Sequence, residues 1–567
     1  MRMSVGDYLL KRLGEIGAHY LFGVPGDYNL WFLEQAERSN HIEFVGCCNE
    51  LNAAYAADGS ARICGISALV TTYGVGELSA IGAVAGAYAE GVPIVCIIGA
   101  PPLGAMEGHA LVHHTLGDGN FVNMLNCHRE FSVAQARIEP ANARYEIDRV
   151  LRCCWLKKRP VYLQLPSDVA ATIIEAGDAS LELCPPISDP TQLSIAIEQI
   201  VNRVADANAP AILLDGDVGR FGLTQSLIRF IQTHSIPFAT LPPAKALIDE
   251  THDLYLGTYR GGGSSPETRD AVETADCLVC VGVRFTDTST GFFSHQLQLN
   301  QLVCIRAFDV MIGTMYLSAV VGHELLNGLI GAVPPRPKRI LPPRAKLRVR
   351  RVTSGQVLTQ ESFWQRMQHF IRINDIVLTD VGTCLAGVAG LEMPKGVTVI
   401  GQPLWAATGY GLPALLGTLL EAPSRRQILF IGDGAFQATA QEISTILGRG
   451  LRAIIFLINN YGYTIERLIL GGASAGYNNV NQWRYAEAIS FFDTNGRASS
   501  YRVGTEGELE AALTEASRSE SLVLIEVVMN RMDAPKALVH FARKCAEFNY
   551  LQGPAAPGIA SINLAGW

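Results

Sequence analysis

Residues 426–467 read RQILFIGDGAFQATAQEISTILGRGLRAIIFLINNYGYTIER, and this stretch decides the fold of the chain. Two short apolar runs, 428–431 and 453–458, have the length and composition of buried strands. The turn GDG (432–434) follows the first run, and the turn NNYG (459–462) follows the second. Apolar residues recur at helical spacing between the two runs. The pattern predicts strand, turn, helix, strand and turn, which together form one parallel βαβ unit.

The two turns are predicted to form a site for an anion and a metal ion. In a parallel βαβ unit both turns lie at the carboxyl ends of neighbouring strands, where backbone N–H groups and helix N-termini favour an anion. Mg²⁺ takes about six oxygen ligands and usually receives several of them from phosphate and water. Asp433, Asn460 and the carbonyl of Gly462 can supply oxygen ligands and leave positions for a diphosphate and a water. A GDG turn alone is more often an ordinary glycine-rich turn, so the spacing between the turns carries the prediction.

This spacing resembles the cofactor signature of thiamine diphosphate enzymes. GDG is separated from NN by the 24 residues 435–458. The run NNYGYTIE is similar to that of the narrower group of pyruvate and indolepyruvate decarboxylases. The resemblance implies that the cofactors are thiamine diphosphate and Mg²⁺, and that Asp433, Asn460 and Gly462 bind the metal. It also implies an α/β fold of three doubly wound parallel-sheet domains, which are pyrimidine-binding, central and diphosphate-binding.

Length and composition also predict several domains and argue against some partners. A chain of 567 residues is too long for one core, and 49% hydrophobic residues provide material for several cores and a subunit interface. The net charge of −8 argues against nucleic acid or an anionic membrane as a partner. The 13 cysteines, an odd number, are typical of a reduced compartment, and the N-terminus lacks the continuous apolar segment of a signal peptide. We therefore expect a cytoplasmic location.

Turn-rich segments divide the chain into domains. Residues 176–190 are rich in turn formers and small polar residues. Residues 333–351 combine prolines with basic residues, which we interpret as a solvated, semi-rigid linker in preference to a nucleic-acid patch. We predict a pyrimidine-binding domain at 1–178, a central domain at 190–335, a diphosphate-binding domain at 355–545 and a C-terminal tail at 546–567.

Apolar runs predict strands in the first two domains. The runs at 68–72, 94–98 and 161–165 are nearly continuous, as expected of parallel strands that are covered on both faces. The central domain has similar runs but no spaced nucleotide-binding fingerprint, so we interpret it as a scaffold with a doubly wound sheet. Its CxxC, Cys277 and Cys280, lies in the apolar run CLVCVGV without a second pair at zinc spacing, which favours a buried strand over a metal site.

Three motifs in the first domain carry candidate catalytic residues. Asp27 lies in the turn of GVPGDYNL, Glu50 lies between an apolar run and a helix of small residues, and His113 and His114 lie in ALVHHTLGDG. Taken singly, such residues are more often a turn residue, a helix cap or a structural histidine. All three motifs match those of the decarboxylase group in the expected order, together with the signature in the third domain.

The resemblance implies a role for each of these groups. A desolvated Glu50 hydrogen-bonded to N1′ of the aminopyrimidine favours the imino tautomer, which serves as the base for the thiazolium. Asp27, His113, His114 and Glu466 carry the protons that are needed to form and release the aldehyde. Which of these groups moves which proton stays open.

Further cofactor contacts follow from the resemblance. Family members have a Gly-Thr comparable to Thr383 and its preceding glycine in LTDVGTCLAG. In the segment GQPLWAATGYG the family usually shows Trp-Gly-Ser-Ile-Gly, and its Ile is the wedge that bends the cofactor. Thr408 stands in place of that Ile and is smaller, whereas the Ala406 carbonyl still offers an acceptor for the aminopyrimidine. The remaining predicted contacts are Gly434, Ala435, Tyr463 and Thr464.

The expected substrate follows from one departure from the family pattern. Ala386 stands where an aromatic residue is common, so we expect a larger pocket. The other predicted pocket residues are Leu385, Ile465 and Ile469. We predict a non-oxidative decarboxylase that converts a bulky aromatic or long 2-oxo acid, such as phenylpyruvate or indolepyruvate, to an aldehyde and CO₂.

Two alternatives stay open at this point. A carboligase of the acetolactate synthase type shares the cofactor halves and the glutamate, although the histidine pair and NNYGYTIE favour a decarboxylase. A catalytically silent homologue that binds the cofactor is supported only by Thr408 and Val381. In the decarboxylase family each site lies between the first domain of one subunit and the third domain of another. We therefore expect a homodimer or homotetramer with sites at the subunit interface.

Overall fold

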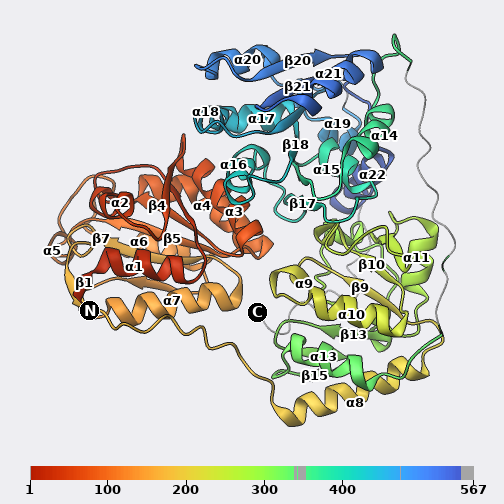
Figure 1. The fold of residues 1–567 in the computed structure, drawn as a ribbon, viewed down its shortest axis with the longest axis horizontal. Helices are drawn as coiled ribbons and strands as arrows, with labels where there is room; N and C mark the ends of the chain where they lie inside the picture. The colour runs from red at the N-terminus through yellow and green to blue at the C-terminus, as the bar shows by residue number, and fades with distance from the viewer. Residues whose placement is uncertain (1, 338–340, 342–352, 473, 551–567) are drawn as a thin grey trace.

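The computed structural model describes residues 2–337, 341, 353–472 and 474–550, and here three α/β units are built on three larger sheets (Figure 1). The predicted α/β class with three domains of mainly parallel sheets is confirmed. Residues 338–340 and 342–351 of the predicted linker and residues 551–567 of the predicted tail lie outside the described residues.

The first sheet is six-stranded and entirely parallel, in the order β3-β2-β4-β5-β7-β6. The strands predicted from the apolar runs are confirmed as β4, β5 and β7, and every residue of these three strands is buried. The strand bounds are Tyr20–Gly23 (β2), Glu43–Gly46 (β3), Ser67–Thr72 (β4), Ile94–Ala100 (β5), Gln135–Arg137 (β6) and Val161–Pro166 (β7). A short antiparallel pair, Arg2–Ser4 (β1) with Ile173–Glu175 (β8), joins the two ends of this domain.

Helices cover both faces of the first sheet, as a doubly wound fold requires. Residues of α3 and α4 belong to the core on one face, and residues of α1 and α7 belong to the core on the other. The helices are Val5–Glu15 (α1), Leu30–Glu37 (α2), Glu50–Cys64 (α3), Val75–Glu90 (α4), Leu103–Glu107 (α5), Asn123–Arg129 (α6) and Ala143–Lys157 (α7).

The central sheet has seven strands in the order β11-β10-β9-β12-β13-β14-β15, and only its first five are parallel. The last two form an antiparallel hairpin that the prediction of a doubly wound sheet did not include. The hairpin turns at Gly313, whose φ of 60° suits a two-residue turn. The strands are Ala211–Leu214 (β9), Phe238–Thr240 (β10), Tyr255–Thr258 (β11), Leu278–Val281 (β12), Leu302–Ile305 (β13), Val310–Ile312 (β14) and Met315–Leu317 (β15).

The CxxC lies at the centre of this sheet, and the buried-strand interpretation is confirmed. Cys280 belongs to β12, Cys277 precedes it, and both are buried free thiols. The helices of the central domain are Pro190–Asp206 (α8), Asp217–Arg220 (α9), Thr224–His234 (α10), Pro242–Ala244 (η1), Pro266–Glu273 (α11), Asp287–Thr290 (α12), Leu299–Gln301 (η2) and Gly322–Ala332 (α13).

The third sheet is six-stranded and parallel, in the order β17-β16-β18-β19-β21-β20. The βαβ unit predicted from residues 426–467 is confirmed, because β18 and β19 are parallel neighbours. Its connection is two helices, α17 and α18, separated by a 3₁₀ turn, η3, and not one continuous helix. The strands are Ile376–Thr379 (β16), Thr398–Ile400 (β17), Gln427–Gly432 (β18), Ile454–Asn459 (β19), Ser499–Val503 (β20) and Val523–Val528 (β21).

The helices of the third domain include one that crosses a predicted boundary. α22 (Lys536–Tyr550) spans the predicted start of the tail at residue 546. Figure 1 shows α22 beside α15 and α19, on the side of this domain that faces the central domain. The others are Gln360–Phe370 (α14), Thr383–Ala389 (α15), Gly411–Glu421 (α16), Asp433–Thr439 (α17), Ala440–Glu442 (η3), Ile443–Gly448 (α18), Thr464–Leu470 (α19), Gly476–Asn478 (η4), Tyr485–Phe492 (α20) and Glu506–Arg518 (α21).

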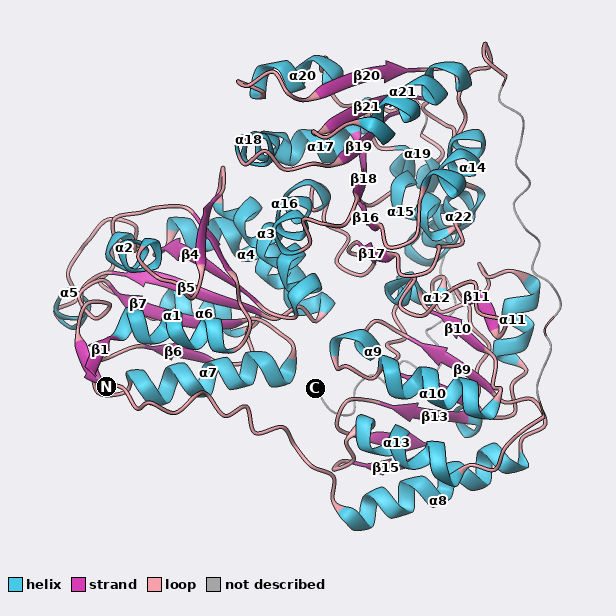
Figure 2. Ribbon diagram, in the orientation of Figure 1, coloured by secondary structure: helices cyan, strands magenta, loops and turns pink. Residues whose placement is uncertain are grey.

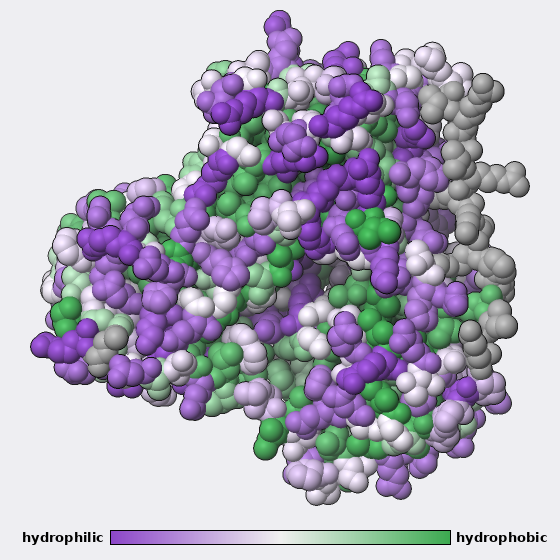
Figure 3. Space-filling model, viewed as in Figure 1, coloured by the Kyte–Doolittle hydropathy of each residue, from purple (hydrophilic) through white to green (hydrophobic). Residues whose placement is uncertain are grey.

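The first and third domains of one chain join through α3 and α16 (Figure 2). Glycines allow the two helices to touch, because a Cβ at Gly59 would overlap the Ala414 carbonyl and a Cβ at Gly417 would overlap the Ala56 carbonyl. Buried residues from both domains therefore form one continuous core at this junction. On the face drawn in Figure 3, polar residues cover most of the surface. Within the described part of the chain, no helix has the length and apolar character needed to cross a membrane.

Candidate active site

Asp433 anchors the site in the third domain. It follows β18 directly as the first residue of α17, and its side chain is buried. The carboxylate accepts hydrogen bonds from the backbone N–H groups of Gly434 (2.8 Å) and Gly462 (2.9 Å). Burial raises the pKa of Asp433 to about 6, although these two N–H groups and the nearby Arg467 oppose the shift. A buried carboxylate that keeps a raised pKa is suited to a cation as its partner.

Asn460 and Gly462 lie beside Asp433, at the carboxyl end of β19. Asn460 is buried, and its side-chain amide makes no hydrogen bond to any of the described residues. Gly462 has a φ of 123°, and a Cβ there would overlap the carbonyl of Asn478, so only glycine fits. Its own carbonyl already accepts a hydrogen bond from Thr464 N (3.1 Å). The structure thus brings the predicted metal ligands together around a buried carboxylate and an unpaired amide.

Arg467 holds this loop in place, although no sequence signal marked it. Its side chain is fully buried, and it donates to the carbonyls of Asn460 (3.2 Å), Tyr461 (2.5 Å) and Asn478 (3.1 Å). Arginine on the exposed face of a helix is common, so the run TIERLIL gave no indication of this role. The guanidinium fixes the backbone on which the predicted metal ligands lie.

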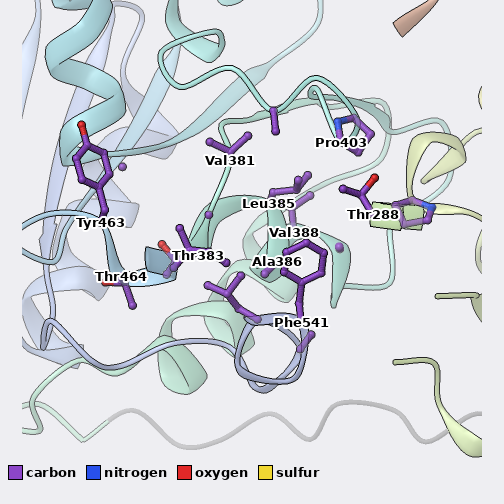
Figure 4. Close-up of a pocket in the computed structure, with 18 of the residues that line it drawn as sticks. Thr288, Val381, Thr383, Leu385, Ala386, Val388, Pro403, Tyr463, Thr464 and Phe541 are labelled. Carbon is purple, nitrogen blue, oxygen red and sulfur yellow. The ribbon is translucent and has the colours of Figure 1, made fainter. Parts of the chain in front are cut away.

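A cavity of about 380 Å³ opens from these residues. Figure 4 shows Tyr463 and Thr464 at one side of it, Thr288 at the opposite side, and Leu385, Ala386, Val388 and Phe541 between them. All the residues predicted for the third domain line this cavity: Thr383, Leu385, Ala386, Ala406, Thr408, Asp433, Gly434, Ala435, Asn460, Gly462, Tyr463, Thr464, Ile465, Glu466 and Ile469. Thr288 of the central domain and Phe541 of α22 also line it, and nothing in the sequence pattern marked them.

The segment of Ala406 and Thr408 is held by Asp380. Ala406 has a φ of 56°, which is uncommon for a residue other than glycine. The buried Asp380 carboxylate accepts hydrogen bonds from the N–H groups of Gly409 (3.3 Å) and Gly411 (2.9 Å), just after this segment. Burial raises the pKa of Asp380 to about 6, and these N–H groups oppose the shift. Asp380 therefore fixes the backbone directly after Ala406 and Thr408.

The candidate catalytic residues of the first domain form a separate cluster. His113 Nε2 lies 2.6 Å from Asp27 Oδ2, and His114 Nε2 lies 3.6 Å from Asp27 Oδ1. The ring of Tyr28 stacks on His113 with centroids 5.0 Å apart. The structure therefore brings Asp27 together with two histidines that lie more than eighty positions later in the sequence.

Glu50 borders the same edge of the first sheet. It is the first residue of α3 and is partly exposed, and a Cβ at Gly76 would lie 3.3 Å from its Oε1. A Cβ at Gly74 would overlap the carbonyl of His114, so the turn after β4 touches both Glu50 and the histidine pair. The neighbouring Glu77 is buried and accepts hydrogen bonds from Gly74 N (2.8 Å) and Tyr162 Oη (3.0 Å). Burial raises the pKa of Glu77 to about 7, against these hydrogen bonds.

The two groups of residues do not share a cavity within one chain. Among the described residues, none from the first domain lines the cavity that contains Asp433. One chain therefore holds two separate groups of candidate residues, one at the carboxyl edge of the first sheet and one at the carboxyl edge of the third.

Comparisons with known proteins identify the family. The chain is 41% identical over 545 residues to "Alpha-keto-acid decarboxylase" of Mycobacterium avium (strain 104), covering 95% of this chain and 96% of the relative. It is 39% identical over 560 residues to the protein of the same name from Mycobacterium leprae (strain TN), covering 98% of each. The chain belongs to the thiamine diphosphate-dependent 2-oxo acid decarboxylases. The predicted family, and with it the assignment as an enzyme, is confirmed.

Family models locate the cofactor-binding domains of this decarboxylase family member. Residues 3–120 match the N-terminal TPP binding domain of thiamine pyrophosphate enzymes, 197–322 the central domain and 380–527 the C-terminal TPP binding domain. The predicted cofactor, thiamine diphosphate, is supported by these matches. The residues present fit its diphosphate. Cβ atoms at Gly382 and Gly432 would meet no other atom, so there is space for a ligand at these two glycines, which line the same cavity as the unpaired Asn460 amide.

Proposed function

We propose that this chain catalyses the non-oxidative decarboxylation of a bulky aromatic or long 2-oxo acid to an aldehyde and CO₂. One observation supports the proposed size of the substrate. The cavity that Asp433 lines is also lined by Ala386 and by an apolar wall of Leu385, Val388 and Phe541 (Figure 4). Burial of an apolar side chain in such a space contributes about 1.5–3 kcal/mol. The name that these relatives carry, alpha-keto-acid decarboxylase, supports the reaction class.

The cofactor contacts are proposed from the half-site in the third domain. Asp433, Asn460 and the Gly462 carbonyl would bind Mg²⁺, which would supply positive charge beside the diphosphate. Thr383, Gly434 and Ala435 would contact the diphosphate, while Tyr463 and Thr464 border the same space. The Ala406 carbonyl would accept a hydrogen bond from the aminopyrimidine, and Thr408 would support the bend of the cofactor.

The proton chemistry is proposed from the half-site in the first domain. When bound, thiamine diphosphate supplies a thiazolium that adds to the keto carbon and accepts the electron pair left by CO₂. Glu50 would hold the proton at N1′ of the aminopyrimidine. Asp27, His113 and His114, with Glu466 from the third domain, would deliver protons to the product, since the short contact of His113 with Asp27 links two of them.

We further propose a homodimer or homotetramer in which each site joins half-sites of two chains. Glu50 needs a desolvated position for its role, yet it is partly exposed in one chain. Large apolar residues are exposed next to the cluster of the first domain: Leu30, Trp31, Val75, Leu111 and Leu116. Others are exposed in the third domain: Trp405, Tyr463, Leu470, Tyr477 and Trp483. Exposed apolar surface of this kind is typical of a subunit interface.

Mixing two inactive variants tests the shared site. Glu50→Gln and Asp433→Asn each disable one half-site, so a mixed dimer contains one intact site and one doubly altered site. Refolding or co-expressing the two chains is expected to restore roughly a quarter of the wild-type activity for random pairing in a two-fold dimer. Mixtures that stay inactive, together with an active monomer in light scattering, would overturn the shared site.

A substrate panel tests the reaction itself. We expect CO₂ and aldehyde from phenylpyruvate and indolepyruvate, only with thiamine diphosphate and Mg²⁺ present, and a lower kcat/KM for pyruvate. Acyloin as the sole product would identify a carboligase, and cofactor binding without CO₂ would identify a silent homologue. A clear preference for pyruvate would refute the proposed substrate size.

A further inference from the structure

Basic side chains also line the cavity. They come from Arg260 and Lys245 of the central domain and from His540 and Lys544 of α22. The only acidic residues in its lining, Asp433 and Glu466, belong to the proposed cofactor half-site in the described chain. The lining therefore combines an apolar wall with more basic than acidic side chains.

Arg260 differs from the two lysines because it lacks a partner. Lys245 Nζ pairs with Glu250 Oε2 at 2.7 Å, and Lys544 Nζ pairs with Glu547 Oε2 at 2.6 Å. The Arg260 guanidinium makes no hydrogen bond or ion pair with any described residue. Burial lowers the pKa of Arg260, an effect that Tyr255 opposes, but a guanidinium stays charged under physiological conditions. Arg260 is only partly buried, so its unpaired guanidinium stays accessible from the cavity and can bind a ligand that supplies the opposite charge.

His540 lies next to Arg260 and is also unpaired. A Cβ at Gly263 would lie 3.4 Å from His540 Cδ2 and 3.8 Å from Arg260 Cβ, so the two side chains start on either side of this glycine. His540 Nε2 is buried and has no hydrogen-bond partner among the described residues. Burial lowers the pKa of His540, and Arg543 and Lys544 act in the same direction. A neutral imidazole with its proton on Nε2 is a hydrogen-bond donor.

The position of Arg260 relative to the apolar wall follows from its neighbours. A Cβ at Gly291 would lie 2.7 Å from the Arg260 carbonyl, and Gly291 ends α12, which carries Thr288. In Figure 4, Thr288 lies across the cavity from Tyr463 and Thr464. A ligand that reacts at the cofactor end and extends along the wall therefore points its far end toward Arg260.

We propose that Arg260 binds a carboxylate at the far end of the substrate, so that the preferred long substrates are 2-oxo diacids. This inference rests on the proposed function, since it assigns the distal end of the same substrate. A planar carboxylate matches the fork of a guanidinium, and charge-assisted hydrogen bonds of this kind are about twice as strong as neutral ones. The length of the apolar wall selects the spacing between the two ends of the substrate.

Matched pairs of 2-oxo acids test the distal carboxylate. The pairs share a chain length and differ only at the end: 2-oxoglutarate with 2-oxopentanoate, 2-oxoadipate with 2-oxohexanoate, and 2-oxopimelate with 2-oxoheptanoate. For the best length we expect kcat/KM of the diacid to exceed that of its neutral partner by about tenfold or more. In Arg260→Gln this ratio is expected to fall to about one or below, and Arg260→Lys is expected to keep part of it because a charge remains.

Arg229→Gln is the matched control. Arg229 is an exposed arginine on α10 of the same domain, and its guanidinium donates a hydrogen bond to Asn327 Oδ1. Its replacement should leave the ratio unchanged. Raised ionic strength should reduce the diacid preference less than it would for an exposed charge pair, because the Arg260 site is partly buried.

The outcomes separate this inference from the proposed function. Turnover of the neutral acids with a diacid ratio near one at every length, or a ratio that survives Arg260→Gln, overturns the distal carboxylate while decarboxylation stands. No CO₂ from any acid in the presence of thiamine diphosphate and Mg²⁺ overturns the proposed function and this inference with it. The comparison requires that the Arg260→Gln variant is folded, which its melting temperature shows. If this variant does not fold, Arg260→Lys is compared with wild type in its place.

Discussion

Filling the cavity at Ala386 is the most direct test of the proposed substrate size. Ala386 faces the same space as Leu385, Val388 and Phe541, and a phenyl ring added at this position would occupy that space (Figure 4). Burial of a phenyl-sized substrate group there is worth about 1.5–3 kcal/mol, which corresponds to roughly 10- to 150-fold in kcat/KM. We therefore expect Ala386→Phe to lower the ratio of kcat/KM for phenylpyruvate to that for pyruvate by about this factor. Pyruvate needs none of this space, so its own kcat/KM should change little.

The assay couples aldehyde formation to an alcohol dehydrogenase and follows both substrates at saturating cofactor. Ala511→Phe is a suitable control, because Ala511 is an exposed residue of α21 outside the cavity lining. An unchanged ratio in an Ala386→Phe variant that melts close to the wild-type temperature would refute the reasoning. It would mean that the substrate side chain does not lie along the wall formed by Ala386.

Three further substitutions test the groups that position the half-sites. Burial raises the pKa of Glu77 to about 7, so the folded chain keeps a proton that the unfolded chain releases near pH 4.5. The contribution of this carboxyl to stability is therefore fully present below pH 4.5 and is lost as the pH rises through 7. The difference in free energy of unfolding between Glu77→Gln and wild type should therefore shift by about 2.5 kcal/mol in favour of the variant from pH 5 to pH 8. Urea unfolding at both pH values measures this difference, and parallel pH profiles of the two proteins would contradict the reasoning. Asp380→Ala should leave the N–H groups of Gly409 and Gly411 unpaired, at a cost of about 1–3 kcal/mol each. The variant should bind thiamine diphosphate more weakly in a fluorescence titration. Unchanged affinity would show that Asp380 does not position the loop. Thr408→Ile adds apolar contact worth about 1 kcal/mol and should tighten cofactor binding roughly fivefold, whereas weaker binding would show that this position has no room.

The half-site of the third domain was predictable because its residues follow consecutive strands of one sheet. Asp433 and Asn460 end β18 and β19, which are parallel neighbours, so their proximity follows from local sequence and from the rule that parallel strands share a carboxyl edge. The same rule places Asp27 and Glu50 after β2 and β3. The connection between β18 and β19 was less predictable, because Glu442 in its 3₁₀ turn contacts Asn52 of another domain at 2.8 Å.

The residues that support the site from a distance were not predictable. Arg467 and Asp380 act on backbone groups that only the folded loops bring within reach, and each resembles an ordinary polar residue in sequence. Thr288 enters the cavity from the central domain, 138 residues before residue 426, and Phe541 enters it from α22, 74 residues after residue 467. Neither residue belongs to a motif that local sequence could connect to the site. The antiparallel hairpin β14–β15 was missed because a short hairpin at a sheet edge needs only a glycine turn, which is common in loops.

The packing within one chain explains why its two half-sites do not meet. α3 begins at Glu50, and its first turn is held against η3, because Glu442 accepts hydrogen bonds from Asn52 Nδ2 (2.8 Å) and Cys48 N (3.2 Å). Further along, the close contact of Gly59 with α16 fixes the same helix against the third domain. These contacts hold Glu50 at the carboxyl edge of the first sheet and not in the cavity beside Asp433. Glu50 stays partly exposed among the residues that the structure describes, so this packing supports the proposal that a second copy desolvates the carboxylate.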